Sequence, residues 1–186
     1  MKKVFIDGGA NTGTSLQFFL KKYPNASEFE IHSFEAHPKI FRKLEKNKGK
    51  AKVYNKALYK ENTELDFYLG DILSSSIRKD KTSGSLNTRS PIKVEAIRLA
   101  DFIKSSFSKD DHIVLKLDVE GAEYEILPDL LQEGIFDGWV DILFGEWHVH
   151  KLKEVTQAEH DQLVEALAAK GFKMRDWAAE KGKMEL

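Results

Sequence analysis

The sequence predicts an α/β fold in which a mostly parallel sheet carries helices on both faces. Short apolar segments of strand length alternate with longer segments whose apolar residues recur at helical spacing. Alternation of this kind requires the long crossover connections that join parallel strands. Several apolar segments also end directly in glycines or acidic residues, as is typical of the edge where such a sheet binds its ligand. The length of 186 residues predicts a single domain over residues 1–186.

The first third of the chain alternates between apolar runs and helical spacing. The predicted strands are residues 3–6, 30–34 and 52–54, the last continuing into residues 57–58. The predicted helices are residues 14–23 and a second helix that opens at Pro38 and ends near Gly49.

The middle of the chain departs from this alternation. Two strands are predicted at residues 64–69 and 92–98. The stretch between them is polar, with serines at residues 74–76 and a second polar run at residues 82–90. Its content of Ser, Lys and Asp favours a mobile loop near the site, with an ordinary surface loop as the alternative.

Regular alternation resumes after residue 98. The predicted strands are residues 113–117, 140–144 and 172–177. The predicted helices are residues 99–106, a broken helix over residues 121–127 and 128–132 with Pro128 opening its second piece, and residues 158–170. In the last helix Leu163, Val164 and Leu167 are predicted to face the core. No element is predicted for residues 178–186.

The amino-acid composition argues against several classes of function. The chain has 29 basic and 30 acidic residues and a formal net charge of −1, so its bulk charge does not favour a nucleic-acid partner. No apolar run approaches the ~20 residues that span a bilayer, and the N-terminal residues lack a signal-peptide core. The absence of cysteine excludes disulfides, thiolate metal sites and a cysteine nucleophile. We therefore expect a cytoplasmic protein with no membrane partner.

The first candidate site is the glycine-rich turn Asp7-Gly8-Gly9-Ala10-Asn11-Thr12-Gly13, between the first strand and the first helix. Glycine permits positive φ and close approach of a ligand to the backbone, and the following helix offers unpaired N–H groups. The glycines do not fit the spacing G-x-G-x-x-G, and the turn lacks the lysine of a P-loop, which disfavours a pyrophosphate site. A purely structural turn is the alternative.

The second candidate is Glu35, at the end of the second predicted strand. In an open α/β sheet, ligands lie beyond the C-terminal ends of the strands, where an acid can accept hydrogen bonds from both hydroxyls of a ribose. The glycine turn and Glu35 together predict an adenosine-bearing ligand. A solvated glutamate at a strand end is the alternative.

A third cluster follows the strand at residues 113–117, where Asp118, Glu120 and Glu123 bring three carboxylates to the same edge of the sheet. The helix dipole is enough to explain Glu123. It does not explain Asp118, which directly follows an apolar strand at the ligand-binding edge. Lys116, within that strand, requires a nearby carboxylate or a route to solvent.

A fourth cluster, Glu146-Trp147-His148, follows the strand predicted at residues 140–144. The spacing of His148 and His150 suits two metal ligands, but the sequence indicates no others, so no metal site is predicted. We expect a substrate-contacting or surface loop instead. A divalent ion that assists deprotonation of a hydroxyl through the acidic rim is the alternative.

These motifs together resemble the FkbM family of S-adenosylmethionine-dependent methyltransferases. The resemblance lies in the turn at residues 7–13, in Phe34-Glu35-Ala36-His37-Pro38 and in Lys116-Leu117-Asp118-Val119-Glu120-Gly121-Ala122-Glu123, with weaker matches at residues 55–58, 99–103 and 144–148. It implies a Rossmann-like class I methyltransferase fold and O-methylation of a hydroxyl on a carbohydrate or other small molecule. Gly8 departs from the family pattern, which often has a larger residue there, and Ala36 stands where proline is commoner.

The resemblance also implies the role of each site residue. S-adenosylmethionine would be bound by Asp7, Gly8, Gly9, Asn11, Thr12, Gly13 and Thr14 at its methionine end, by Glu35 and Ala36 at its ribose, by the backbone at Leu58 beside its adenine, and by Asp118 near its methyl. Asp118, Glu120 and His148 are the candidates for a general base; His148 has the better unperturbed pKa and Asp118 the better expected position. The alternatives are a nicotinamide-dependent oxidoreductase, which shares the glycine turn and the acid, and a non-catalytic nucleoside-binding domain.

Overall fold

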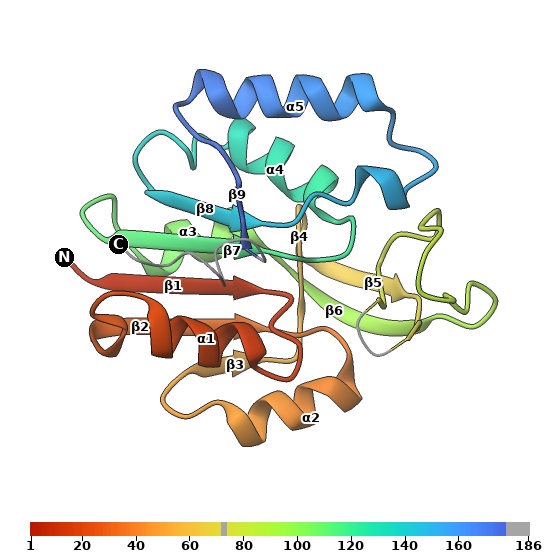
Figure 1. The fold of residues 1–186 in the computed structure, drawn as a ribbon, viewed down its shortest axis with the longest axis horizontal. Coiled ribbons are helices and arrows are strands. Elements are labelled where there is room, and N and C mark those ends of the chain that lie inside the picture. Colours follow the sequence, from red (N-terminus) through yellow and green to blue (C-terminus); the bar gives the residue numbers. More distant parts are fainter. Residues whose placement is uncertain (72–73, 178–186) are drawn as a thin grey trace.

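The centre of the fold is a six-stranded sheet whose strands are all parallel, in the order β3-β2-β1-β7-β8-β9 (Figure 1). The structure is a computed structural model and describes residues 1–71 and 74–177. The strands are β1 (Lys3–Gly8), β2 (Phe29–Phe34), β3 (Lys52–Tyr54), β7 (His112–Leu117), β8 (Ile142–Gly145) and β9 (Arg175–Asp176). The expected Rossmann-like arrangement is confirmed.

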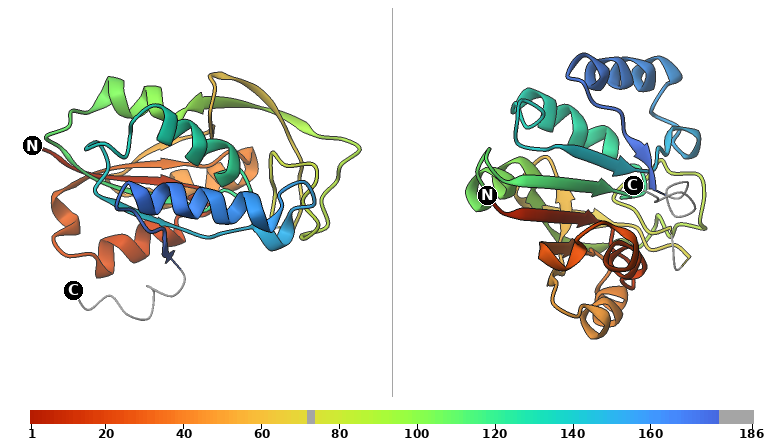
Figure 2. Two further views of the ribbon diagram at one scale, coloured as in Figure 1. Left: turned by 90° about the horizontal axis from the view of Figure 1, so that it is seen from above. Right: turned by 60° about the vertical axis from the view of Figure 1, so that its left-hand side comes forward.

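Helices cover both faces of this sheet (Figure 2). One face carries α1 (Thr14–Lys22) and α2 (Pro38–Asn47), and the other carries α3 (Leu99–Ser106), α4 (Glu123–Gln132) and α5 (Gln157–Ala169). Successive residues of a strand point to opposite faces, so Phe5 packs with α1 while Val4 and Ile6 belong to the core of the opposite face. Phe5 stacks on Phe19 with ring centroids 3.9 Å apart. The apolar runs of the central strands are therefore buried on both sides, as parallel strands require.

A second, three-stranded sheet lies beside the first in the order β4-β6-β5. Its strands are β4 (Ala57–Tyr59), β5 (Thr63–Phe67) and β6 (Ile92–Arg98), with β4 parallel and β5 antiparallel to β6. Arg98, the last residue of β6, joins this sheet to α4 through Asp129 at 2.6 Å and Glu133 at 2.8 Å. The polar stretch between β5 and β6 projects toward the C-terminal ends of the parallel strands (Figure 1).

Residues 52–58 do not form the continuous strand that the sequence predicts. β3 ends at Tyr54, and β4 begins at Ala57 in the other sheet. Between them the Asn55 side chain donates hydrogen bonds to the backbone oxygens of Glu35 at 2.9 Å and Ala36 at 3.1 Å. These bonds fix the end of the second strand and redirect the chain, so a single apolar pattern is divided between two sheets.

Two predictions about the C-terminal half were wrong. The helix predicted as broken over residues 121–132 is one continuous helix, α4, which begins at Glu123 and contains Pro128. Ile126 and Leu130, on either side of Pro128, are both buried in the same core and keep the helix continuous. On α5, Leu163 and Leu167 face the core as predicted, but Val164 is 39% exposed. The buried side of α5 is therefore formed by Leu163 and Leu167, which lie one helical turn apart.

The last predicted strand, residues 172–177, is confirmed only as the two-residue β9 at the sheet edge. Residues 178–186 lie outside the described part of the chain. Within residues 1–71 and 74–177, none of the helices has the length and apolar character needed to cross a membrane.

We expect the substitution Leu167→Ala to lower the free energy of unfolding by about 2–5 kcal/mol, because it leaves a cavity in the core under α5. The matched substitution Val164→Ala, three residues earlier on the same helix, should change it by no more than about 0.5 kcal/mol. Urea denaturation followed by circular dichroism measures both. Equal effects of the two substitutions would contradict this packing of α5.

Candidate active site

A cavity of about 730 Å³ opens at the C-terminal ends of the parallel strands. This is the edge at which an open α/β sheet binds ligands, and the size is that of a small-molecule site. The predicted site residues that line the cavity are Gly9, Asn11, Thr12, Thr14, Glu35, Ala36, Leu58, Asp118 and Glu120. The lining does not include Asp7, Gly8, Gly13 or His148, which lie behind it. The fold thus brings most of the predicted site residues to one cavity.

The glycine turn is a tight bend between β1 and α1. The N–H groups of Gly9 and Ala10 both donate to the carbonyl of Phe34, at 3.1 and 2.9 Å, which ties the bend to the end of β2. Gly9 has a φ of 72°, and a Cβ there would lie 1.9 Å from the backbone oxygen of Asp118. Only glycine permits both this conformation and this approach.

Gly8, the departure from the family pattern, has a packing explanation. A Cβ on Gly8 would lie 2.8 Å from Cδ1 of Leu58 and 3.1 Å from Cδ2 of Leu117. Leu58 is itself a lining residue of the cavity. The missing side chain at position 8 therefore leaves room for Leu58 to reach the site.

Behind the bend lies a buried ion pair. Lys116 Nζ lies 3.0 Å from Asp7 Oδ1, and the two side chains are 1% and 0% exposed. The ammonium also donates to the carbonyls of Gly8 at 3.2 Å and Gly9 at 3.1 Å, while Asp7 Oδ2 accepts from the Ser15 hydroxyl at 2.6 Å. Burial alone would lower the pKa of Lys116, but the carboxylates of Asp7 and Asp118 outweigh it and raise that pKa. Of the two alternatives that the sequence leaves for Lys116, a nearby carboxylate or a route to solvent, the structure shows the carboxylate, which is Asp7.

Glu35 is buried at the end of β2 with both oxygens oriented by backbone. Oε2 accepts from the N–H of Asn11 at 2.9 Å, and Oε1 accepts from the N–H of His37 at 2.7 Å. A carboxylate oxygen has two acceptor positions, so each oxygen can still accept one hydroxyl from a ligand in the cavity. Burial raises the pKa of Glu35 to about 7, against the lowering effect of these two hydrogen bonds.

The three candidate catalytic residues converge, but only two of them line the cavity. His148 Nε2 lies 3.9 Å from Asp118 Oδ1 and 3.7 Å from Glu120 Oε2. Asp118 and Glu120 are partly exposed at 30% and 19%, whereas the His148 side chain is 0% exposed. The surface loop considered for His148 is thus excluded. His148 lies behind the two carboxylates.

Glu123 has a role that the sequence did not indicate. It lies in the first turn of α4, as predicted, but it is fully buried. Its oxygens accept from the N–H groups of Val119 and Gly121, both at 2.8 Å, and lie 3.1 Å from His148 Nδ1. Burial lowers the pKa of His148, but the carboxylates of Glu123 and Glu120 raise it above its ordinary value. Glu123 therefore fixes both the ring orientation of His148 and the turn that carries Glu120.

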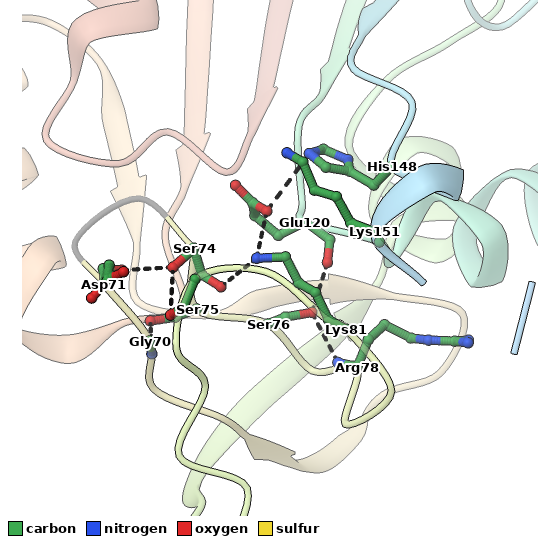
Figure 3. Close-up of polar contacts among 12 residues, drawn as sticks. Gly70, Asp71, Ser74, Ser75, Ser76, Arg78, Lys81, Glu120, His148 and Lys151 are labelled. Atoms are coloured by element: carbon green, nitrogen blue, oxygen red, sulfur yellow. Dashed lines mark hydrogen bonds and ion pairs between the residues drawn. The ribbon is translucent and has the colours of Figure 1, made fainter. Parts of the chain in front are cut away.

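The polar stretch between β5 and β6 closes one side of the cavity, as predicted, and Ser74, Ser75 and Ser83 line it. Figure 3 shows its contacts with Glu120. Lys81 Nζ lies 2.8 Å from Glu120 Oε2 and donates to the carbonyl of Ser74 at 2.6 Å, and the Ser76 hydroxyl donates to the carbonyl of Glu120 at 2.7 Å. Nothing in the sequence distinguishes Lys81 from the other lysines of this stretch. The mobility of this polar stretch remains a prediction.

The sequence matches the family model described as a methyltransferase FkbM domain over residues 7–174. Neither a curated protein nor a solved structure matches the chain. The matched span contains all of the candidate site residues, from Asp7 to His148.

The raised pKa of Glu35 makes the free energy of unfolding depend on pH. In the unfolded chain this carboxyl titrates near pH 4.5, and in the folded protein near pH 7. The stabilisation that the proton of Glu35 gives to the folded state is therefore complete below about pH 4.5 and is lost as the pH rises through about 7. Between pH 5 and 8 we expect the free energy of unfolding of the wild type to fall by about 2–3 kcal/mol more than that of Glu35→Gln, whose amide does not titrate. Urea denaturation of both proteins at the two pH values measures this difference. An identical pH dependence of the two proteins is the contrary result.

Proposed function

The chain belongs to the FkbM family of methyltransferases, and we propose that residues 1–186 form a single domain that methylates a hydroxyl of a carbohydrate or other small molecule. Its methyl donor is S-adenosylmethionine, which the family uses. The observation that carries the proposal is that Glu35, the glycine bend and the Asp118–Glu120 pair all line one cavity. A carboxylate suited to a ribose and carboxylates suited to an acceptor hydroxyl thus line the same space.

The residues of the cavity fit the cofactor. Glu35 is held by the backbone of Asn11 and His37 so that both of its oxygens can accept ribose hydroxyls. Ala36, Ala57 and Leu58 supply apolar lining next to it, which suits an adenine ring. The bend from Gly9 to Thr12 also lines the cavity and precedes the start of α1, and the N–H groups at a helix start favour a carboxylate such as that of a methionine.

When bound by Glu35 and the glycine bend, S-adenosylmethionine would supply the acceptor oxygen with a sulfonium-activated methyl group, the sulfur keeping the electron pair of the broken carbon–sulfur bond. The protein has to hold the acceptor hydroxyl in line and accept its proton. Asp118 and Glu120 reach the cavity surface, which supports them as the groups that contact the hydroxyl. His148 supports them from behind, in the orientation that Glu123 imposes.

The lining of the cavity beyond the cofactor side favours a polar acceptor. Ser74, Ser75 and Ser83 offer hydroxyls, and Lys151, which lies 3.3 Å from Glu146, offers an ammonium group. Such side chains hydrogen-bond to the hydroxyls of a carbohydrate or of a similar polyhydroxylated molecule. We do not propose a nicotinamide-dependent oxidoreductase, because the family match and the glycine spacing both argue against it.

We expect isothermal titration calorimetry to detect binding of S-adenosylhomocysteine and no binding of NAD. The substitution Glu35→Gln should weaken the binding by at least tenfold, because it replaces an acceptor by a donor at the ribose. The wild type should bind up to about tenfold more tightly at pH 8 than at pH 6, since Glu35 ionises over this range, and the variant should lose this dependence. Glu45→Gln, at an exposed position of α2, is the matched control. Tight binding of NAD alone would refute the assignment.

The variants Asp118→Asn, Glu120→Gln and His148→Gln test the acceptor side. We expect the loss of the proton acceptor to lower kcat by about 10²–10⁴-fold, with the affinity for S-adenosylhomocysteine nearly unchanged. The assay measures release of S-adenosylhomocysteine with saturating cofactor and a panel of monosaccharides and small alcohols. If all three variants turned over like the wild type, no base would lie in this set.

A further inference from the structure

We propose that Asp118, Glu120 and His148 form a binding site for a divalent transition-metal cation at the acceptor side of the cavity. One ligand atom from each residue lies within 4.8 Å of the other two. The site requires neither the cofactor nor the acceptor, because all three ligands come from the chain itself. Only the role of the cation in catalysis rests on the proposed function.

The imidazole of His148 is the observation that points to a ligand. Its Nε2 is buried and has no hydrogen-bond partner among the residues that the structure describes. It faces three carboxylate oxygens, at 3.9 Å for Asp118, 3.7 Å for Glu120 and 3.6 Å for Glu146. These distances are too long for hydrogen bonds. Ligands about 2.1 Å from a shared metal ion are separated by roughly 3–4 Å, which is the spacing found here.

The other nitrogen of the same ring is already fixed. His148 Nδ1 lies 3.1 Å from Glu123, which also accepts two backbone N–H groups and is fully buried. A carboxylate on the second ring nitrogen is the usual support of a metal-binding histidine, because it fixes the ring and leaves the other nitrogen as an electron-pair donor. A histidine that served only as an ion-pair partner could approach one of these carboxylates at hydrogen-bonding distance. Here Nε2 remains separated from all three.

Three lysines balance the carboxylates from outside the cluster. Lys81 lies 2.8 Å from Glu120 Oε2, Lys151 lies 3.3 Å from Glu146, and Lys116 lies 3.8 Å from Asp118. Figure 3 shows Lys81 and His148 approaching Glu120 from different sides. Lys81 contacts the Glu120 oxygen that faces His148, so a bound cation and Lys81 compete for this oxygen.

The ligand set favours one class of cation. One imidazole and two carboxylates, with Glu146 as a third within reach, suit Mn²⁺ and similar transition ions better than Ca²⁺ or Mg²⁺, which prefer oxygen ligands alone. Asp118 and Glu120 both line the cavity, so a cation between them has open positions toward the acceptor. There it would coordinate the acceptor oxygen and place it beside the methyl group.

The test is Mn²⁺ binding to the protein of residues 1–186 without cofactor, measured by the loss of the free-ion signal in electron paramagnetic resonance and by calorimetry. We expect one site per chain in the wild type, at least tenfold weaker binding in His148→Gln and in Glu123→Gln, and tighter binding in Lys81→Gln, which removes the competing ammonium. His150→Gln, an exposed histidine two residues away, is the control and should bind like the wild type. Circular dichroism shows whether each variant is folded.

Three results would overturn the site: no Mn²⁺ binding below millimolar concentration in the wild type, binding that His148→Gln leaves unchanged, or binding that appears only in Lys81→Gln. Titration of the same samples with S-adenosylhomocysteine separates this proposal from the proposed function. A protein that binds the nucleoside but no Mn²⁺ refutes the metal site alone. A protein that binds Mn²⁺ but no nucleoside refutes the methyltransferase site alone.

Discussion

The buried ion pair between Asp7 and Lys116 is the interaction on which the rest of the site depends. The two residues are partners in the register of β1 and β7, where both strands deliver the chain to the cavity. A buried pair is stable only when its remaining donors and acceptors are satisfied. Here Ser15 donates to Oδ2 of the carboxylate and two carbonyls of the glycine bend accept from the ammonium, while Oδ1 has Lys116 as its charged neighbour but no hydrogen-bond partner among the described residues. One pair of charges thereby sets the positions of the bend, the start of α1 and the end of β7.

The sequence predicts those parts of the site that a local pattern defines. An apolar run followed by glycines or an acid identifies β1, β2 and β7, and parallel pairing then brings Glu35 and Asp118 to one edge without any knowledge of their contacts. Lys116 is a second example, because a lysine within an apolar strand requires a nearby carboxylate or a route to solvent, and the neighbouring strand β1 supplies Asp7. In both cases the pattern that makes the prediction lies within a few residues, and the regular pairing of parallel strands then brings the distant partners together.

The features that the sequence did not predict depend on contacts between distant segments. Glu123 and His148 are 25 residues apart, and nothing local shows that they meet. Lys81 resembles its neighbours in composition, and only its burial against Glu120 distinguishes it. The departure of β4 from the main sheet likewise depends on Asn55, whose bonds go to the end of another strand. Pattern alone carries no information about such pairings.

The segment between β5 and β6 has a consequence for how the protein can evolve. Its residues Ser74, Ser75 and Ser83 line the cavity, and it is joined at both ends to the small sheet, so none of its described residues belongs to a strand of the six-stranded sheet. Under the proposed function, exchange of this segment between homologues would be expected to change which acceptor fits and to leave Glu35 and the glycine bend in place. Ser76, whose hydroxyl donates to the carbonyl of Glu120, is the position that a graft has to preserve.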